Sequence, residues 1–481
     1  MLRIRITLLL IFTIAASHVL IGQNSSIDYE FRLQEVTFIE GEGRAPLDIY
    51  KDKSGNSNRY FPPHYSTDNS SELRKPVAYV SGATPAVEIV IATDCPAFFV
   101  RGINDVMMFE MIGDDPSVTD EVTGLNTVIL LGAESFEDGI IRYFEDFVIE
   151  YEVSTDGINW MSLDSSINTL YVPYRSTGHL TVLQHTVFDI SCRAANGLRA
   201  VTETEIASVI TTIFNSAYKK NEAGQFPEIF SAVSGEKLTY YGVHPLDVDP
   251  PYTCAPSALR LLDSKDGRCG AWGELFNFTI QVQGMDWDYT EALYAYFLQP
   301  TTDRTNTGEG IIPMSAASKD SLESDFNAVF SPESYHEDLN LHTPYYYFMV
   351  KNWNDAAEGQ FIELYEGLGL DSIYEIEIAQ SALGSPGVLG QGNVQDPRSI
   401  FRNHSITYYP GMILDPSYGV SYFNPEWQED YQDVNLNQYE NDNLATARGT
   451  LVKRQISEDV YKYYYWVEEL IHPTDFQFIL W

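Results

Sequence analysis

Short β-type runs, separated by clusters of Asn, Asp, Gly and Ser, dominate residues 28 to about 193. Runs of this kind, bounded by turn-forming residues, are typical of strands. The run 148–153 is followed by Asp156-Gly157, and Asn159-Trp160 opens a return run, which predicts a hairpin. We therefore predict an antiparallel β-sandwich over residues 23–195. The main runs are 78–80, 86–92, 98–100, 128–131, 147–153 and 170–172.

The pattern changes near residue 202, where side chains begin to recur at helical spacing. A helix is predicted over 203–220, and Thr202 with Glu205 forms a candidate capping box at its start. Residues 257–262 predict a second helix. A third helix begins near Cys269, with Gly284 as its stop signal. The positions at helical spacing are Ile206, Val209, Ile210, Ile213, Leu275, Phe276, Thr279 and Val282.

Strand signals return in the last third of the chain, so the predicted fold class is α+β. Residues 345–350 predict a strand. Residues 429–443 are acidic and polar, which predicts a solvated loop. The aromatic-rich end, 460–481, is expected to pack back on the preceding domain.

The formal net charge is −39 over 481 residues, of which 44% are hydrophobic and 13% aromatic. This composition is that of a folded chain with ample core-forming material. The negative charge argues against nucleic acid or an anionic membrane as a partner. An acidic, solvated surface on an exported protein is the simplest explanation.

The first residues have the pattern of an export signal. Arg3 and Arg5 precede an apolar run over 6–16, and Gly22 offers a small residue at a cleavage boundary. We predict a signal peptide over 1–22 and a periplasmic, cell-surface or extracellular protein. A retained N-terminal anchor is the alternative. No later apolar stretch is long enough to predict a membrane-spanning segment.

The chain has four cysteines: Cys95, Cys192, Cys254 and Cys269. Export permits disulfides, and Cys95 with Cys192 is the preferred pair if Cys269 is a free nucleophile. No cysteine or histidine spacing matches a zinc site, so we predict neither a metal site nor a cofactor.

Cys269 follows a short glycine loop and opens the third predicted helix. Free backbone N–H groups and the helix dipole favour negative charge at that position, which lowers the pKa of a thiol. The position suits a nucleophile, and the alternative is a buried structural cysteine. A nucleophilic cysteine needs a base.

His404 supplies a candidate base, because residues 404–409 and 412–415 predict a hairpin with Pro410-Gly411 as its turn. With these two turn residues, position 406 faces 415 and 404 faces 417. His404 and Asp415 then share one sheet face as diagonal neighbours, about 7 Å apart at Cβ, within reach of a hydrogen bond. A slip of one residue would place them on opposite faces.

These motifs resemble those of the transglutaminase-like superfamily, which includes transglutaminases, peptide:N-glycanases and bacterial papain-like hydrolases. The segment GRCGAWGELFNFTIQVQGM (267–285) is similar to the family's nucleophile helix, and NHSITYYPGMILDPSYG (403–419) to its histidine strand and Asp-Pro-Ser turn. The resemblance implies that Cys269 is the nucleophile, His404 the base and later acid, and Asp415 the group that orients His404.

The resemblance covers about residues 196–425, with an expected insertion over 286–398 and a C-terminal extension over 426–481. The paired zinc cysteines of many peptide:N-glycanases are absent from the sequence, which argues against that activity. The Cys269 N–H is a candidate oxyanion donor. Gln391 and Trp272 are candidates for an oxyanion or substrate contact, and Gln391 is alternatively a turn residue.

The resemblance implies an exported thiol hydrolase or acyltransferase that attacks amide bonds of a protein or peptide substrate through a thioester. Hydrolysis is the slightly preferred outcome. The alternative is a non-catalytic scaffold that uses the N-terminal domain. Residues 143–160 resemble a pattern of jelly-roll and discoidin-like domains, which often bind carbohydrate, so a cell-surface glycan is a candidate partner.

Overall fold

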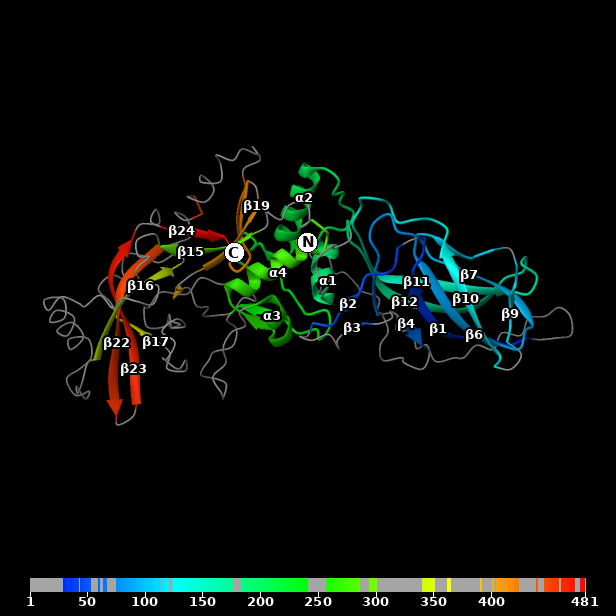
Figure 1. The fold of residues 1–481 in the computed structure, drawn as a ribbon, viewed down its shortest axis with the longest axis horizontal. Coiled ribbons are helices and arrows are strands. Elements are labelled where there is room, and N and C mark those ends of the chain that lie inside the picture. Colours follow the sequence, from blue (N-terminus) through cyan, green and yellow to red (C-terminus); the bar gives the residue numbers. More distant parts are fainter. Residues whose placement is uncertain are drawn as a thin grey trace, which may run out of the picture.

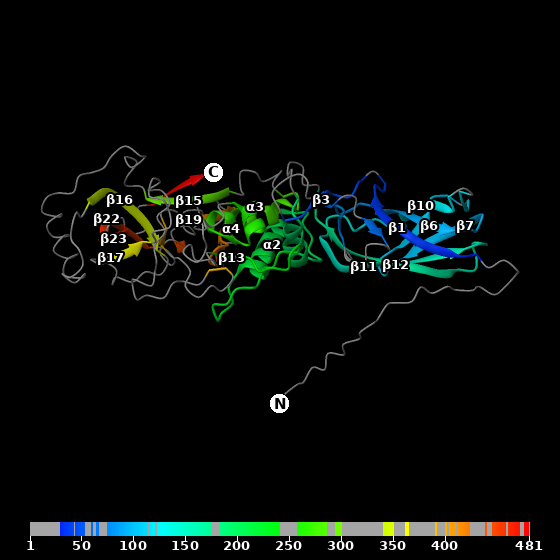
Figure 2. The same cartoon turned by 90° about the horizontal axis from the view of Figure 1, so that it is seen from below.

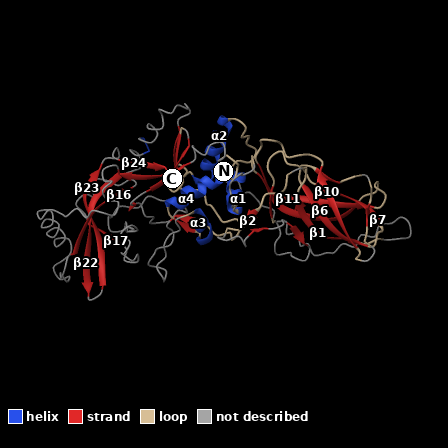
Figure 3. Ribbon diagram, in the orientation of Figure 1, coloured by secondary structure: helices blue, strands red, loops and turns tan. Residues whose placement is uncertain are grey.

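The computed structural model describes residues 29–42, 44–52, 59–60, 64–66, 75–113, 115–120, 123–175, 183–240, 257–285, 294–300, 340–350, 361–364, 390–391, 400–401, 404–409, 411–423, 438–439, 445–457, 460–471 and 476–480. The predicted signal peptide and Cys254 lie outside these residues. The described part forms an elongated molecule with helices between two strand-rich ends (Figure 1). Figure 3 shows the same division by secondary structure.

The N-terminal part is one large sheet whose path runs β4 (His64–Ser66), β1 (Phe31–Ile39), β6 (Ala86–Thr93), β10 (Leu125–Gly132), β8 (Met108–Met111), β7 (Ala97–Ile103), β11 (Arg142–Ser154), β12 (Met161–Val172) and β5 (Pro76–Ala78). A short strand, β9 (Ser117–Val118), pairs with β7. The neighbours are antiparallel except β12 and β5, which are parallel. The predicted hairpin is confirmed as β11–β12.

Alternating burial gives this sheet one buried face. In β10 every second side chain is buried, and β6 follows a similar alternation. The inward side chains fill one core, and β1 also contacts β12. The prediction of antiparallel β structure is therefore confirmed, but the strands form a single near-barrel sheet rather than the two separate sheets of a sandwich.

Four α-helices occupy the middle of the described chain (Figure 2). They are α1 (His185–Ala194), α2 (Glu203–Ile213), α3 (Ala258–Ser264) and α4 (Cys269–Gln281), and a π-helical turn, Phe214–Tyr218, continues α2. The predicted capping box of α2 is confirmed: the Glu205 N–H donates to Thr202, and the Thr202 N–H to the Glu205 carboxylate. Gly284 lies just beyond α4 with φ 69°, as its predicted role requires.

Helix α1 belongs to the helical part, not to the N-terminal sheet. Val187 and Phe188 lie in the same core as the buried side chains of α2, α3 and α4. The structure therefore places the change of architecture before α1, rather than at the predicted residue 195. The sequence pattern did not predict α1, which is 10 residues long.

The strand-rich end that follows α4 contains two five-stranded antiparallel sheets. One runs β21 (Val420–Phe423), β20 (Met412–Asp415), β19 (His404–Tyr409), β15 (Tyr294–Pro300) and β24 (Phe476–Leu480). The other runs β17 (Phe361–Leu364), β23 (Val460–Ile471), β22 (Ala445–Ser457), β16 (Asn340–Val350) and β18 (Ile400–Phe401). Two-residue pairs complete the strands: β2 (Ile49–Tyr50) with β3 (Arg59–Tyr60), and β13 (Thr239–Tyr240) with β14 (Asp266–Gly267).

The insertion and the C-terminal extension share one sheet. Strands β16 and β17 of the insertion pair with β22 and β23 of the extension. The extension also sends β24 to pair with β15, next to β19. The end of the chain thus belongs to the same sheet as β19, through a strand of the predicted insertion. No helix in the described residues is long and apolar enough to cross a membrane.

Candidate active site

Cys269 is the first residue of α4, as predicted. Helix α3 ends at Ser264, and its C-cap Lys265 has a left-handed φ of 68°. The chain then passes through β14 to Arg268, the N-cap of α4. The parallel pairing of β14 with β13 fixes this approach. The first N–H groups of an α-helix have no intrahelical acceptor, so they favour negative charge on the sulfur or on a nearby oxyanion. The local structure therefore suits a thiolate.

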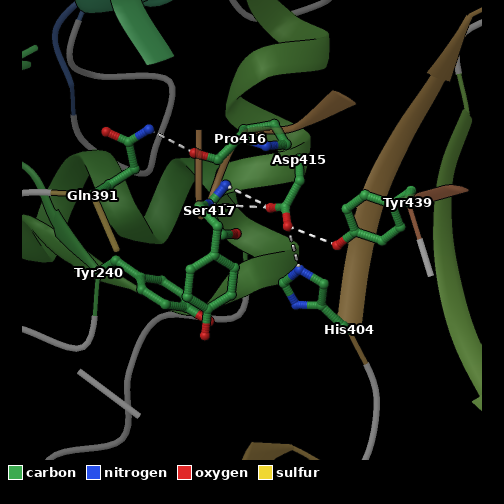
Figure 4. A network of polar contacts seen from close by, with 8 residues as sticks. Tyr240, Gln391, His404, Asp415, Pro416, Ser417 and Tyr439 are labelled. Atoms are coloured by element: carbon green, nitrogen blue, oxygen red, sulfur yellow. Dashed lines mark hydrogen bonds and ion pairs between the residues drawn. The ribbon is translucent and has the colours of Figure 1, made fainter. Parts of the chain in front are cut away.

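His404 and Asp415 meet in the predicted hairpin. The pairing of Tyr409 with Met412 and of Thr407 with Leu414 is the register expected from a Pro410-Gly411 turn. His404 Nε2 lies 3.0 Å from Asp415 Oδ2 (Figure 4). The hairpin turn thus sets the contact, because it puts both side chains on one sheet face.

Four polar groups contact the Asp415 carboxylate. Its Oδ1 accepts the backbone N–H groups of Ser417, at 3.1 Å, and Tyr418, at 3.2 Å. Its Oδ2 accepts the Tyr439 hydroxyl at 2.7 Å and faces His404 (Figure 4). Asp415 is fully buried, and a buried carboxylate with this many donors is held in one orientation. It can therefore orient the imidazole.

The thiol and the imidazole are paired electrostatically. Burial acts to raise the pKa of Cys269, but the nearby His404 imidazole, the Ser405 backbone and the Arg268 charge outweigh it and lower that pKa. Burial lowers the pKa of His404, yet Asp415 and Cys269 raise it to about 9. Because Asp415 holds Nε2, Nδ1 is the ring nitrogen left for the thiol. The pair therefore favours thiolate and imidazolium at neutral pH.

The other described cysteines behave differently. Burial raises the pKa of Cys95, and burial raises that of Cys192 to about 12. Both are free thiols, so the predicted Cys95–Cys192 disulfide is wrong. Cys95 lies in the core of the N-terminal sheet and Cys192 in the helical core, which keeps them apart. Sequence spacing does not report such distances.

Gln391 is close to the site but its amide does not point to a reacting oxygen. Its Nε2 donates to the carbonyls of Tyr218, at 2.8 Å, and Pro416, at 2.6 Å, and its N–H donates to Ser417. Figure 4 shows it directed at the turn that follows Asp415. Its donors are committed to backbone, so these contacts favour a role in holding this turn over the predicted oxyanion role.

Trp272 is a core residue. It is fully buried, and its ring meets Tyr218 edge-on at 6.4 Å between centroids. Its Nε1 donates to the Thr239 carbonyl at 3.3 Å. The indole N–H is thus used within the fold, which does not favour the predicted oxyanion or substrate contact. Cys269 N–H stays the best-placed candidate donor.

Gly273 sets how closely α4 approaches β19. A Cβ at this position would lie 3.1 Å from Ser405 Oγ and 3.9 Å from Ser405 Cβ. Ser405 follows His404, and Gly273 is one helical turn after Cys269, so the same contact spaces the thiol from the imidazole. The Ser405 hydroxyl is buried without a hydrogen-bond partner among the described atoms, so its removal costs the fold no hydrogen bond among them.

Gly273→Ala is expected to slow alkylation of Cys269 at pH 6 by about tenfold. The added methyl group pushes α4 and β19 apart by a few tenths of an ångström, which weakens the contact between thiol and imidazole. The double variant Gly273→Ala with Ser405→Ala is expected to recover most of the rate, since the remaining 3.9 Å contact is ordinary. Mass spectrometry of the alkylated peptide gives both rates. Equal rates in all three proteins would contradict the spacing role.

Among the described residues, no group of three or more His, Cys, Asp or Glu side chains is arranged to hold a metal ion.

Tyr439 contacts Asp415 but was not among the site residues predicted from the sequence, because it lies in the segment predicted to be a solvated loop.

A scan against protein-family models returned no match, and a search of curated proteins also returned none.

Proposed function

We propose that the protein is an exported, transglutaminase-like thiol enzyme that acts on amide bonds. The observation that carries this proposal is the joint placement of Cys269, His404 and Asp415, with the pKa of the thiol lowered and that of the imidazole raised. Opposite shifts in a nucleophile and its base are expected where a thiolate–imidazolium pair is stabilised for catalysis.

In the proposed reaction the Cys269 thiolate attacks the amide carbonyl carbon. The oxyanion that forms is placed near the N-terminus of α4, where N–H groups stabilise it. The C–N bond then breaks as His404 Nδ1 gives its proton to the leaving amine, which leaves a thioester. Water, or a second amine, gives a proton to His404 as it attacks the thioester, and the thiolate is released.

Asp415 keeps its charge through this cycle and holds Nε2, so that Nδ1 remains the nitrogen that exchanges protons. Cys269 is only 5% exposed and His404 1%, so an amide substrate reaches the sulfur only after the site opens. The Tyr418 ring packs beside the imidazole, with its centroid 5.4 Å from that of His404. Burial of this kind keeps water from the site until the substrate is bound.

Hydrolysis is the preferred outcome within this proposal, with a protein or peptide as the substrate. The test is incubation with a glutamine-containing protein and a labelled primary amine. We expect peptide cleavage or ammonia release that is lost in Cys269→Ala, with little amine incorporated. Cys269-dependent incorporation as the main product would instead identify acyl transfer. The absence of any Cys269-dependent reaction over a range of proteins and peptides would contradict the enzyme proposal.

The contacts of Trp160 do not favour glycan binding by the N-terminal sheet. The Arg101 guanidinium lies 4.2 Å from the Trp160 ring centroid and is itself paired with Glu152. A ring whose face stacks on an arginine offers less surface to a sugar. These contacts give no support to the alternative of a scaffold that binds glycan through the N-terminal sheet.

A further inference from the structure

Tyr439 is a buried residue within a polar segment. The surrounding stretch, 429–443, is rich in Asp, Glu, Asn and Gln, yet the Tyr439 side chain is fully buried. Its ring packs edge-to-face with that of Tyr422, on β21, with centroids 6.0 Å apart and an interplanar angle of 83°. A buried tyrosine hydroxyl requires a hydrogen-bond partner, and this partner is Asp415.

We propose that Tyr439 is a positioning residue of the Cys269–His404–Asp415 site, supplied by the C-terminal extension. The Tyr439 hydroxyl donates at 2.7 Å to Asp415 Oδ2, the same oxygen that lies 3.0 Å from His404 Nε2 (Figure 4). Backbone N–H groups hold the other oxygen, and the Tyr439 hydroxyl helps to set where Oδ2 points. This inference rests on the proposed function.

The phenol also moderates the electrostatic pull of Asp415 on His404. A hydrogen bond from a neutral hydroxyl stabilises the carboxylate charge, so Asp415 attracts the imidazolium less strongly than a bare carboxylate would. Burial, followed by the Asp415 charge, raises the pKa of Tyr439 well above its usual range, so the hydroxyl remains a donor throughout the working pH range. An imidazolium that is held too strongly is a poor acid for a leaving amine.

Tyr439→Phe tests this role, because it removes the hydroxyl and keeps the ring against Tyr422. The rate of Cys269 alkylation by iodoacetate, an anion that favours the imidazolium form, is measured against pH. We expect the alkaline decline near pH 9 to move upward by about half a pH unit, with the rate at pH 7 within threefold of the wild type. Amide turnover, where it is measurable, is expected to fall about tenfold.

Tyr79→Phe is the matched control. Tyr79 is fully buried in the N-terminal sheet, and its hydroxyl donates to the carbonyls of Ile39 and Ala86. This variant loses a comparable hydrogen bond far from Asp415, so its pH profile should stay that of the wild type. Identical profiles for Tyr439→Phe and Tyr79→Phe would overturn the positioning role and leave Tyr439 a structural residue.

Two further measurements decide the role of Tyr439 when turnover is absent or when Tyr439→Phe does not fold. If no amide turnover is found for the wild type, the alkylation profile still decides the role of Tyr439, separately from the proposed function. If Tyr439→Phe does not fold, Tyr422→Leu removes the ring edge that supports Tyr439 and should shift the alkaline decline in the same direction. An unchanged decline in Tyr422→Leu would then count against the proposal.

Discussion

Replacing His404 with alanine is expected to raise the pKa of Cys269 above that of an ordinary thiol and to slow its alkylation at pH 7 by about a hundredfold. Burial is the largest influence on this thiol and acts to raise its pKa, while His404 provides the strongest opposing contributions. Without the imidazole, the Ser405 backbone, the Arg268 charge and the N-terminus of α4 are left to oppose burial. A thiol whose pKa lies well above 7 is almost entirely protonated at pH 7, so little thiolate is left to react.

His185→Ala is the matched control for this prediction. His185 is also buried, at the start of α1, and its Nε2 lies 3.0 Å from the Tyr171 hydroxyl. Its loss should lower the thermal stability without changing the reactivity of Cys269. Alkylation of Cys269 that is equally fast in His404→Ala and in the wild type would show that the imidazole does not activate the thiol.

Asp415→Asn is expected to lower amide turnover by about three to four orders of magnitude while the chain stays folded. The asparagine carbonyl can still accept the N–H groups of Ser417 and Tyr418. Its amide group would then face His404 Nε2 as a donor and force that nitrogen to become an acceptor. The proton would move to Nδ1, so the neutral ring could no longer take a proton from the thiol.

The measurement is amide turnover together with the pH profile of Cys269 alkylation, and Asp52→Asn is the matched control. Asp52 is another buried carboxylate, which accepts the hydroxyls of Thr186 and Ser231 at the start of α1. Asp52→Asn should lower the thermal stability and leave amide turnover unchanged. A fully active Asp415→Asn protein would contradict the assignment of Asp415 as the residue that orients His404.

Local features of the site could be predicted from the sequence. The N-terminus of α4 follows from helical spacing that begins at Cys269, and the β19–β20 register follows from a two-residue turn. Both depend on neighbours in the chain. The contact of His404 with Asp415 is a direct consequence of that register, because side chains alternate across a strand.

Features that depend on distant parts of the chain were not predictable in this way. Tyr439 carries no periodic signal, and its burial depends on a contact with Asp415, 24 residues away in the sequence. Strand β16 pairs with β22, about 100 residues later, so the shared sheet of insertion and extension left no local pattern. The sequence predicts a sandwich where the structure has a single N-terminal sheet, because strands with alternating burial have the same sequence pattern in both architectures.

The most direct test of the central claim is the rate of Cys269 alkylation by iodoacetate as a function of pH, followed by mass spectrometry of the labelled peptide. Thiolate forms as the pH rises through the lowered pKa of Cys269, and the imidazolium is lost as the pH rises through about 9. We expect a bell-shaped profile that rises well below the pKa of an ordinary thiol and declines near pH 9. A single rise at or above the pKa of an ordinary thiol, as expected for Cys192, would contradict it.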